Sequence, residues 1–421
     1  MRTVKFMVSL ILILILVACQ LPEEKEYQSY FSESPSLVSE DEINNQKLIE
    51  IWTPEDIVSN TLRYFSHQYE EYEFKVTVVD RLDLVDTYYE ALLTNNEPDL
   101  MIISAQDVGA FSGLDMFETL NVEPYYNHQF FSQRPTRELE KYINDDGEMY
   151  GFPIHFFPYV TLYRADILGE YGFPTDPGEL AAYISDVDNW LNMVTTLYED
   201  GLYAYESTQT ILEWALDTTY PFDGDYQYLY QEEPFSNLID VLIELDRLDY
   251  DLDLSIWRTP GHQALKNDRL VMIQGASFMD DIIHDWFPEQ EGKWRVTTLP
   301  FGMRGIDKET GLVATIPKNA NNKSIVWNLV RALSDDLLNL HALSTNHPLF
   351  DQDNLGEFYL EVLNQPAIGK PSMLDKTAQL LWENSVYRVN QGYPLNETFF
   401  QQTHNQVIEQ VRNNRRVLSN N

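Results

Sequence analysis

Hydrophobic and polar positions in the first third of the chain predict alternating strands and helices. A short apolar run at 48–52 is typical of a buried strand. Thr53 as N-cap and Pro54 predict a helix from there to residue 71, whose apolar side chains recur at spacings of four, three and four. Residues 74–79 and 100–104 are predicted strands, with a helix over 86–95 between them. This alternation favours a parallel α/β sheet with crossover helices.

The pattern changes in the middle of the chain. Residues 147–163 are predicted to be extended, with His155 and Pro158 among aromatic residues, as expected of a chain that crosses between two lobes. Asp176 is placed to cap a helix that begins near Pro177. The remaining predicted elements are helices at 179–198, 238–248 and 324–333, a helix end at 263–268, and strands at 269–274, 293–300 and 311–317.

The N-terminus predicts export and a lipid anchor. Arg2 and Lys5 precede an apolar stretch at 6–18, which is shorter than the roughly 20 residues that a transmembrane helix needs. Residues 16–19 (Leu-Val-Ala-Cys) resemble the lipobox of bacterial lipoproteins, so residues 1–18 are expected to be a signal peptide and Cys19 to be lipidated. A plain signal peptide with a structural cysteine is the alternative. Residues 19–46, polar and proline-containing, are predicted to tether the folded part to the outer face of the cell membrane.

Length and charge exclude several classes of partner. The chain has 421 residues, of which 28 are Lys or Arg and 67 are Asp or Glu, giving a net charge of -39. The length is sufficient for two or three domains with their own cores. The charge repels nucleic acid and anionic membrane surfaces. Because a neutral solute gains nothing from it, we expect this charge to serve hydration in a saline or alkaline environment, and the steering of a cationic ligand is the competing interpretation.

Four segments together resemble the extracellular solute-binding proteins of family 1, which are lipid-anchored or periplasmic receptors of ABC importers, many of them for sugars. The resemblance covers about residues 47–410. The segments are Glu97-Pro98-Asp99-Leu100-Met101-Ile102; Tyr150-Gly151-Phe152-Pro153 with 162–166 and 171–174; residues 265–275; and Thr298-Leu299-Pro300 with 311–317. The chain departs from the family signature at Arg164, where an asparagine follows the tyrosine in the family, and residues 302–309 contain less glycine than usual.

The resemblance implies an α/β, two-lobed periplasmic-binding-protein-like fold of type II, with interleaved lobes joined by hinge strands. The first lobe is expected to contain residues 47–155 and 312–345, and the second residues 156–311 and 346–421. The implied function is capture of a small solute, expected to be a sugar or oligosaccharide, by a monomer that delivers it to the transmembrane subunits of an ABC permease.

No motif in the sequence predicts catalysis, a cofactor or a metal. The chain lacks the P-loop, the Gly-x-Gly-x-x-Gly and Gly-x-Ser-x-Gly motifs and the His-Glu-x-x-His motif. Its eight His residues do not have zinc-ligand spacing, and its acidic turns fall short of an EF-hand loop. We therefore expect no enzyme, although a lipoprotein that binds cell-wall glycan or a protein without serving transport, and a lipoprotein glycosidase, remain open alternatives.

Ligand-binding residues are expected between the lobes, at the ends of strands, where polar and aromatic side chains converge. Aromatic rings would pack on the C–H face of a pyranose while carboxylates and amides bind its hydroxyls. The alternatives are a core position for each aromatic residue, a helix cap for Asp107 and an interlobe hydrogen bond for His155. The candidates are Trp52, Gln106, Asp107, His155, Tyr159, Trp214, Tyr220, Gln274, Ser277 and Phe278.

Overall fold

The computed structural model describes residues 47–250, 252–343 and 346–418. The predicted signal peptide, Cys19 and the tether lie outside this range. Within the range, every helix is too short or too polar to be a candidate membrane span.

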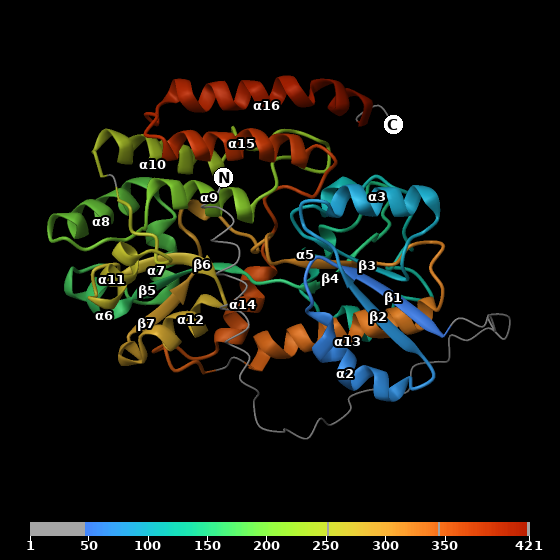
Figure 1. The fold of residues 1–421 in the computed structure, drawn as a ribbon. Helices are drawn as coiled ribbons and strands as arrows, with labels where there is room; N and C mark the ends of the chain where they lie inside the picture. The colour runs from blue at the N-terminus through green and yellow to red at the C-terminus, as the bar shows by residue number, and fades with distance from the viewer. Residues whose placement is uncertain (1–46, 251, 344–345, 419–421) are drawn as a thin grey trace. The chain divides into compact units, whose positions relative to one another are not determined.

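The first lobe is built on a five-stranded mixed sheet with the order β2-β1-β3-β8-β4. β1 pairs in parallel with β2 and β3, as the alternation of strands and helices predicts, whereas β8 runs antiparallel to both β3 and β4. In Figure 1, α3 covers one face of this sheet, and α2 and α13 cover the other. The strands are β1 (Leu48–Thr53), β2 (Glu73–Val78), β3 (Leu100–Ser104), β4 (Phe152–His155) and β8 (Leu312–Thr315); the helices are α2 (Val58–Phe65), α3 (Leu84–Thr94), α4 (His128–Phe131), α5 (Thr136–Glu140) and α13 (Lys323–Leu343), with 3-10 turns η1 (Ser66–Gln68) and η2 (Val108–Phe111).

The predicted start of the first helix is wrong by four residues. Thr53 continues β1, and its hydroxyl donates to the Glu55 carbonyl at 2.6 Å, so it does not cap a helix. The helix begins at Val58 after Asp56 accepts a bond from the Ser59 amide at 3.0 Å. The strand hydrogen bonds of Thr53 therefore outweigh its local capping preference.

The second lobe is built on an antiparallel three-stranded sheet with the order β6-β5-β7. β5 follows β4 after three residues, which is the crossing predicted from the extended pattern. Helices α15 and α16 pack side by side over this lobe (Figure 1). The strands are β5 (Tyr159–Arg164), β6 (Met272–Ala276) and β7 (Trp294–Thr297); the helices are α6 (Ala165–Glu170), α7 (Pro177–Ile184), α8 (Val187–Glu199), α9 (Thr208–Thr218), α10 (Phe235–Arg247), α11 (Thr259–Lys266), α12 (Met279–Trp286), α14 (Leu355–Leu363), α15 (Asp375–Asn390) and α16 (Glu397–Leu418), with 3-10 turns η3 (Pro288–Gln290) and η4 (Pro300–Gly302).

Each sheet has a hydrophobic cluster on both of its faces. The five-stranded sheet packs Ile49 and Ile51 on one side, and Met101 and Ile103 on the other. In the three-stranded sheet, Tyr163 points to the face covered by α7 to α10, and Val160 and Leu162 point to the face covered by α11 and α12. Two separate pairs of core layers explain why the chain forms two lobes.

Asp176 caps α7, as the sequence predicts. Its carboxylate accepts from the amides of Gly178 and Glu179 at 2.9 and 3.1 Å, and Pro177 occupies the first turn. We expect Asp176→Ala to lower the free energy of unfolding by about 1 kcal/mol, measured by urea denaturation. Asp240→Ala, at an exposed position inside α10, is the control. An equal loss in both variants would contradict a specific cap.

Candidate binding site between the lobes

The two lobes touch where β3 of the first lobe ends. Tyr220, 2% exposed, follows α9 in the second lobe, and its hydroxyl donates to the Ala105 carbonyl at 3.0 Å. The Lys308 ammonium lies 4.5 Å from the centre of the Tyr220 ring and donates to the Thr219 carbonyl. Tyr220 is therefore a binding candidate that the structure places at the boundary between the lobes.

Two glycines fix the path of the segment that carries Tyr220. A Cβ at Gly305 would lie 1.9 Å from the Thr218 carbonyl oxygen, and one at Gly369 would lie 2.1 Å from the Tyr220 carbonyl oxygen. Gly369 also has a φ of +77°, which favours glycine. Residues 218–220 thus pass closely between two backbone segments that only glycine accommodates.

An aromatic row extends from the crossing segment. The Phe157 ring is T-shaped to both His155 and Phe278, with centroids at 4.8 and 5.0 Å. His155 Nδ1 lies 3.0 Å from the Thr310 carbonyl oxygen, which can only accept, so Nδ1 carries the proton. The sequence predicts His155 and Phe278 as candidates but not Phe157, which joins them.

Beside this row, Tyr159 lies within a cluster of carboxyl groups. Asp307, 7% exposed, accepts from the Glu309 and Thr310 amides at 3.0 and 3.1 Å, and its side chain also hydrogen-bonds that of Asp217 on α9. Burial, reinforced by the negative charge of Asp307, raises the pKa of Asp217 well above its ordinary value. Burial, with Asp217 and Asp307, likewise raises the pKa of Tyr159 well above 10.0.

Three candidates lie at the carboxyl ends of first-lobe strands. Trp52 is half-buried and packs on Tyr88 with ring centroids 5.9 Å apart. Gln106 is also half-buried. Asp107 accepts from the Ser104 hydroxyl at 2.8 Å and lies 3.4 Å from the Lys376 ammonium at the start of α15. Asp107 therefore both closes its own turn and pairs with the second lobe.

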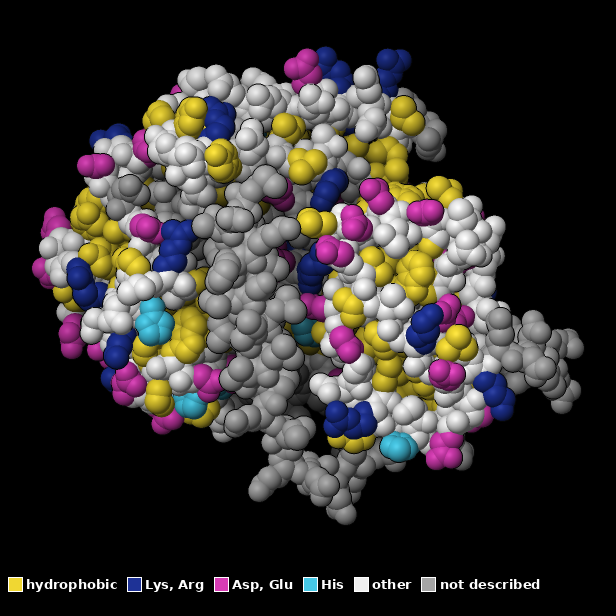
Figure 2. Space-filling model, viewed as in Figure 1, with side chains coloured by type: hydrophobic (Ala, Val, Ile, Leu, Met, Phe, Trp, Pro, Cys, Tyr) yellow, Lys and Arg dark blue, Asp and Glu magenta, His cyan; other side chains and the backbone are white. Residues whose placement is uncertain are grey.

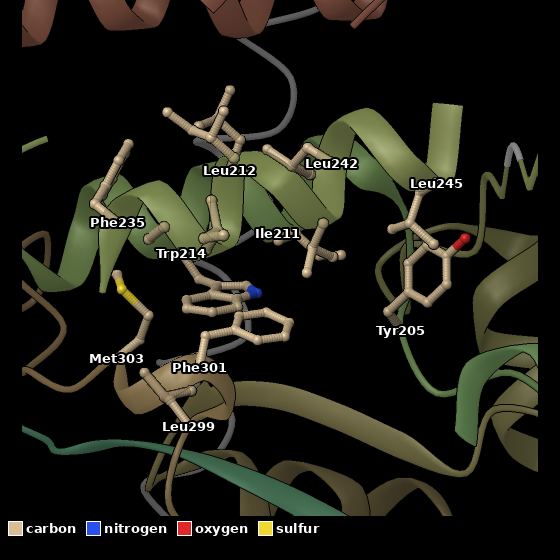
Figure 3. Close-up of a cluster of buried hydrophobic side chains, with 14 of the residues drawn as sticks. Tyr205, Ile211, Leu212, Trp214, Phe235, Leu242, Leu245, Leu299, Phe301 and Met303 are labelled. Carbon is tan, nitrogen blue, oxygen red and sulfur yellow. The ribbon is translucent and has the colours of Figure 1, made fainter. Parts of the chain in front are cut away.

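The other three candidates lie within the second lobe. Trp214 is 2% exposed and packs among Phe301, Met303 and the α10 side chains in the core shown in Figure 3. Ser277 is buried, and its backbone amide donates to the Pro158 carbonyl at 2.9 Å. Gln274 is 7% exposed on β6. Ser277 directly precedes Phe278 of the aromatic row, and Gln274 pairs with Thr161 two residues from Tyr159, whereas Trp214 is enclosed in the core.

The carboxyl cluster around Tyr159 is not among the residues predicted from the sequence. One signal was available on α9, where Glu213 and Asp217 stand four residues apart and share a helix face. A second was the charged run Asp307-Lys308-Glu309 next to the last hinge strand. Asp217 and Asp307 do not form a glycosidase pair, because such carboxyl groups stand about 5–9.5 Å apart rather than hydrogen-bonded to each other.

One side-chain group elsewhere has the composition of a metal site. Ligand atoms of Asp280, Asp281 and His347 lie within 4.8 Å of one another. The Leu349 amide donates to His347 Nδ1 at 3.2 Å, so the ring proton sits on Nε2, which faces Asp281 at 3.1 Å. Hydrogen bonding that occupies both ring nitrogens accounts for this cluster without a metal ion.

The chain therefore has the two-lobed α/β fold of type II periplasmic binding proteins, with polar and aromatic side chains where the lobes meet. No family model and no curated protein sequence matches it. Solved structures do. A structure described as an extracellular solute-binding protein of family 1 aligns with a TM-score of 0.69 and 14% identity over 86% of this chain and 99% of the other.

Two further structures extend this comparison. The sugar-binding protein MalE of Xanthomonas citri gives a TM-score of 0.68 and 15% identity, over 89% of this chain and all (100%) of that one. The galacto-N-biose-/lacto-N-biose I-binding protein of Bifidobacterium longum gives 0.64 and 14%, over 87% and 97%. At this identity the likeness establishes the fold, which agrees with the fold that the sequence resemblance implies.

Proposed function

We propose that this protein is an extracytoplasmic receptor that binds a sugar or oligosaccharide and delivers it to the permease subunits of an ABC importer. Lipidated Cys19 would hold it on the outer face of the membrane, and it needs no catalytic residue. The structural neighbours, which include a MalE sugar-binding protein and a lacto-N-biose-binding protein of an ABC transporter, support this proposal.

The observation that carries the proposal is that side chains of the second lobe contact the first lobe directly after the end of β3. Tyr220 bonds Ala105, and Lys376 pairs with Asp107, each across the boundary. A ligand held by both lobes stabilises their closed arrangement. A shift from mostly open to mostly closed needs about 5.5 kcal/mol of differential binding, and micromolar affinity supplies about 8 kcal/mol.

Phe157 and Phe278 are proposed as the stacking surface for a sugar ring. The two rings are arranged edge to face, and the half-buried Phe278 ring keeps part of its apolar surface exposed. Trp52, Gln106, Asp107 and His155 would approach the solute from the first lobe, and Tyr159 from the second. Trp214 is left out because its indole is enclosed in the core.

A ligand panel tests the proposal. Mono- and oligosaccharides, amino acids and polyamines are compared by thermal shift, and a true ligand at a hundredfold excess over its Kd stabilises by about 2.7 kcal/mol. X-ray scattering should then show compaction with that ligand. Phe278→Ala should weaken saccharide binding about tenfold, or about 1.4 kcal/mol, whereas Tyr387→Ala, on an exposed side chain of α15, should not. Binding of amino acids alone, or of nothing in the panel, would reject a sugar receptor.

A further inference from the structure

Carboxyl groups outnumber basic groups around Tyr159. Glu206, Glu213, Asp217 and Asp307 all act on the Tyr159 hydroxyl, and Glu309 and Glu55 continue the same electrostatic network. Among the described residues, the basic groups acting on these carboxylates are Arg81, Arg258 and Lys308. In the view of Figure 2, acidic side chains are scattered over the surface of both lobes, whereas Glu206 and Asp307 of this cluster are buried.

Each of the three basic groups also has defined partners of its own. Arg81 pairs with Glu55 at 3.1 Å and donates to the Glu309 carbonyl at 2.6 Å. Arg258 pairs with Asp253 at 3.2 Å, and Lys308 is held by the Thr219 carbonyl and the Tyr220 ring. Burial and the charge of Asp307 raise the pKa of Asp217 by more than Lys308 lowers it, so the protonated form of Asp217, hydrogen-bonded to Asp307, is favoured. A cation placed between them would replace that proton.

A second observation points to a ligand that also accepts hydrogen bonds. The Thr161 hydroxyl, on a residue with 0% exposure, and the Gln274 amide nitrogen, on a residue with 7%, are buried and have no partner in the described part of the chain. Thr161 stands directly opposite Gln274 in the sheet. Because Thr161 is two residues from Tyr159, all three side chains share one sheet face, which the carboxyl cluster also borders. The Gln274 N–H group needs an acceptor, which a sugar hydroxyl provides.

We propose that the solute is an amino sugar or an oligosaccharide of amino sugars, whose ammonium group binds at Asp217 and Asp307 and whose hydroxyls meet the polar groups around Tyr159. This inference rests on the proposed function and names its substrate class. A neutral sugar would leave the carboxyl pair holding its proton, whereas an ammonium group would expel it to solvent. Asp307, Lys308 and Glu309, together with Tyr159, Tyr220 and Tyr230 from the neighbouring elements, are the groups that act on Asp217 in this equilibrium.

Three disaccharides that differ only at carbon 2 provide the test. The β-1,4-linked glucosamine disaccharide, its N-acetylated form and cellobiose carry ammonium, acetamide and hydroxyl groups on the same framework. At a mildly acidic pH, titration calorimetry of the purified protein should give at least about tenfold tighter binding of the amino form, or about 1.4 kcal/mol. Its apparent enthalpy should also vary with the ionisation enthalpy of the buffer, because a proton is released. Equal or weaker binding of the amino form would overturn the inference.

Matched variants locate the charge that is recognised. Asp217→Asn should reduce the affinity for the amino disaccharide to that for cellobiose and leave cellobiose binding within about twofold. Asp240→Asn makes the same change of charge at an exposed position of the same lobe and should alter neither. Should Asp217→Asn fail to fold, Glu213→Gln, exposed on the same face of α9, takes its place with the same expected loss of selectivity.

The remaining outcomes separate the inference from the proposed function. Binding of neutral sugars without the amino form would overturn the inference and leave the sugar receptor standing. Spermidine binding more tightly than the amino disaccharide would overturn its carbohydrate part. Failure of every saccharide to bind would reject both.

Discussion

Replacing Lys141 with Met is expected to lower the free energy of unfolding by about 3–5 kcal/mol. The Lys141 ammonium lies 2.5 Å from the Glu138 carboxylate, with side-chain exposures of 7% and 2%. Glu138 also accepts from the Tyr142 hydroxyl at 3.0 Å. Methionine keeps the length of the side chain but leaves a buried carboxylate without its cation, and the loss should appear in urea denaturation at neutral pH.

The same helix supplies the control. Arg137 and Glu140 are also three residues apart but have side-chain exposures of 50% and 46%, so Arg137→Met should cost less than about 1 kcal/mol. The double variant Glu138→Gln/Lys141→Met should recover much of the stability, because it removes both charges. Equal losses at Lys141 and Arg137 would show that the buried pair contributes no more than a surface pair.

Glu206→Gln is expected to make the protein more stable than the wild type in alkaline solution. Glu206 is 6% exposed, its carboxylate accepts from the Ile256 amide at 3.3 Å, and burial raises its pKa from 4.5 to about 8. The folded state therefore favours the protonated form. Its contribution to stability is complete below pH 4.5 and is lost as the pH rises to about 8, by up to about 1.4 kcal/mol per pH unit.

The measurement is the free energy of unfolding from pH 5 to 9 for the wild type and the variant. The difference between them should grow with pH in favour of Glu206→Gln and level off above pH 8. Glu199→Gln, at an exposed position of α8, should give a curve parallel to that of the wild type. A parallel curve for Glu206→Gln would mean that this carboxyl ionises as freely in the folded state as in the unfolded one.

Sequence patterns predicted the fold most accurately where a single physical factor, such as the burial of every residue in a strand, decides the local structure. All five residues of β3 are buried, and the apolar run gave its bounds correctly. The sequence predicted one helix over 179–198, but the chain forms α7 and α8, because the Asp186 carboxylate accepts from the Asn189 amide at 2.9 Å and starts a second helix. Asp186 is a possible N-cap in the sequence, but the helical periodicity continues on both sides of it, so the break between the two helices was not predicted.

The candidate site was harder to predict because its groups meet only in the folded chain. His155 lies in the segment that crosses between the lobes and Phe278 follows a strand, so their places along the chain indicated them. Asp217 and Asp307, by contrast, are ninety positions apart in a chain with 67 acidic residues. Trp214 was predicted as a binding residue from its residue type, which does not show in which direction the side chain points. On α9 its side chain points into the core while the neighbouring Glu213 is exposed, which only the orientation of the helix decides.

The contact of Tyr220 with Ala105 bears on how such a protein could change its specificity. Its acceptor is a main-chain oxygen, so the contact is independent of which side chain stands at that position of the first lobe. Two glycines hold Thr218 and Tyr220 in place from the other side. Under the proposed function, substitutions at Gln106 would therefore change which solute is bound without changing the contact between Tyr220 and Ala105 that joins the lobes.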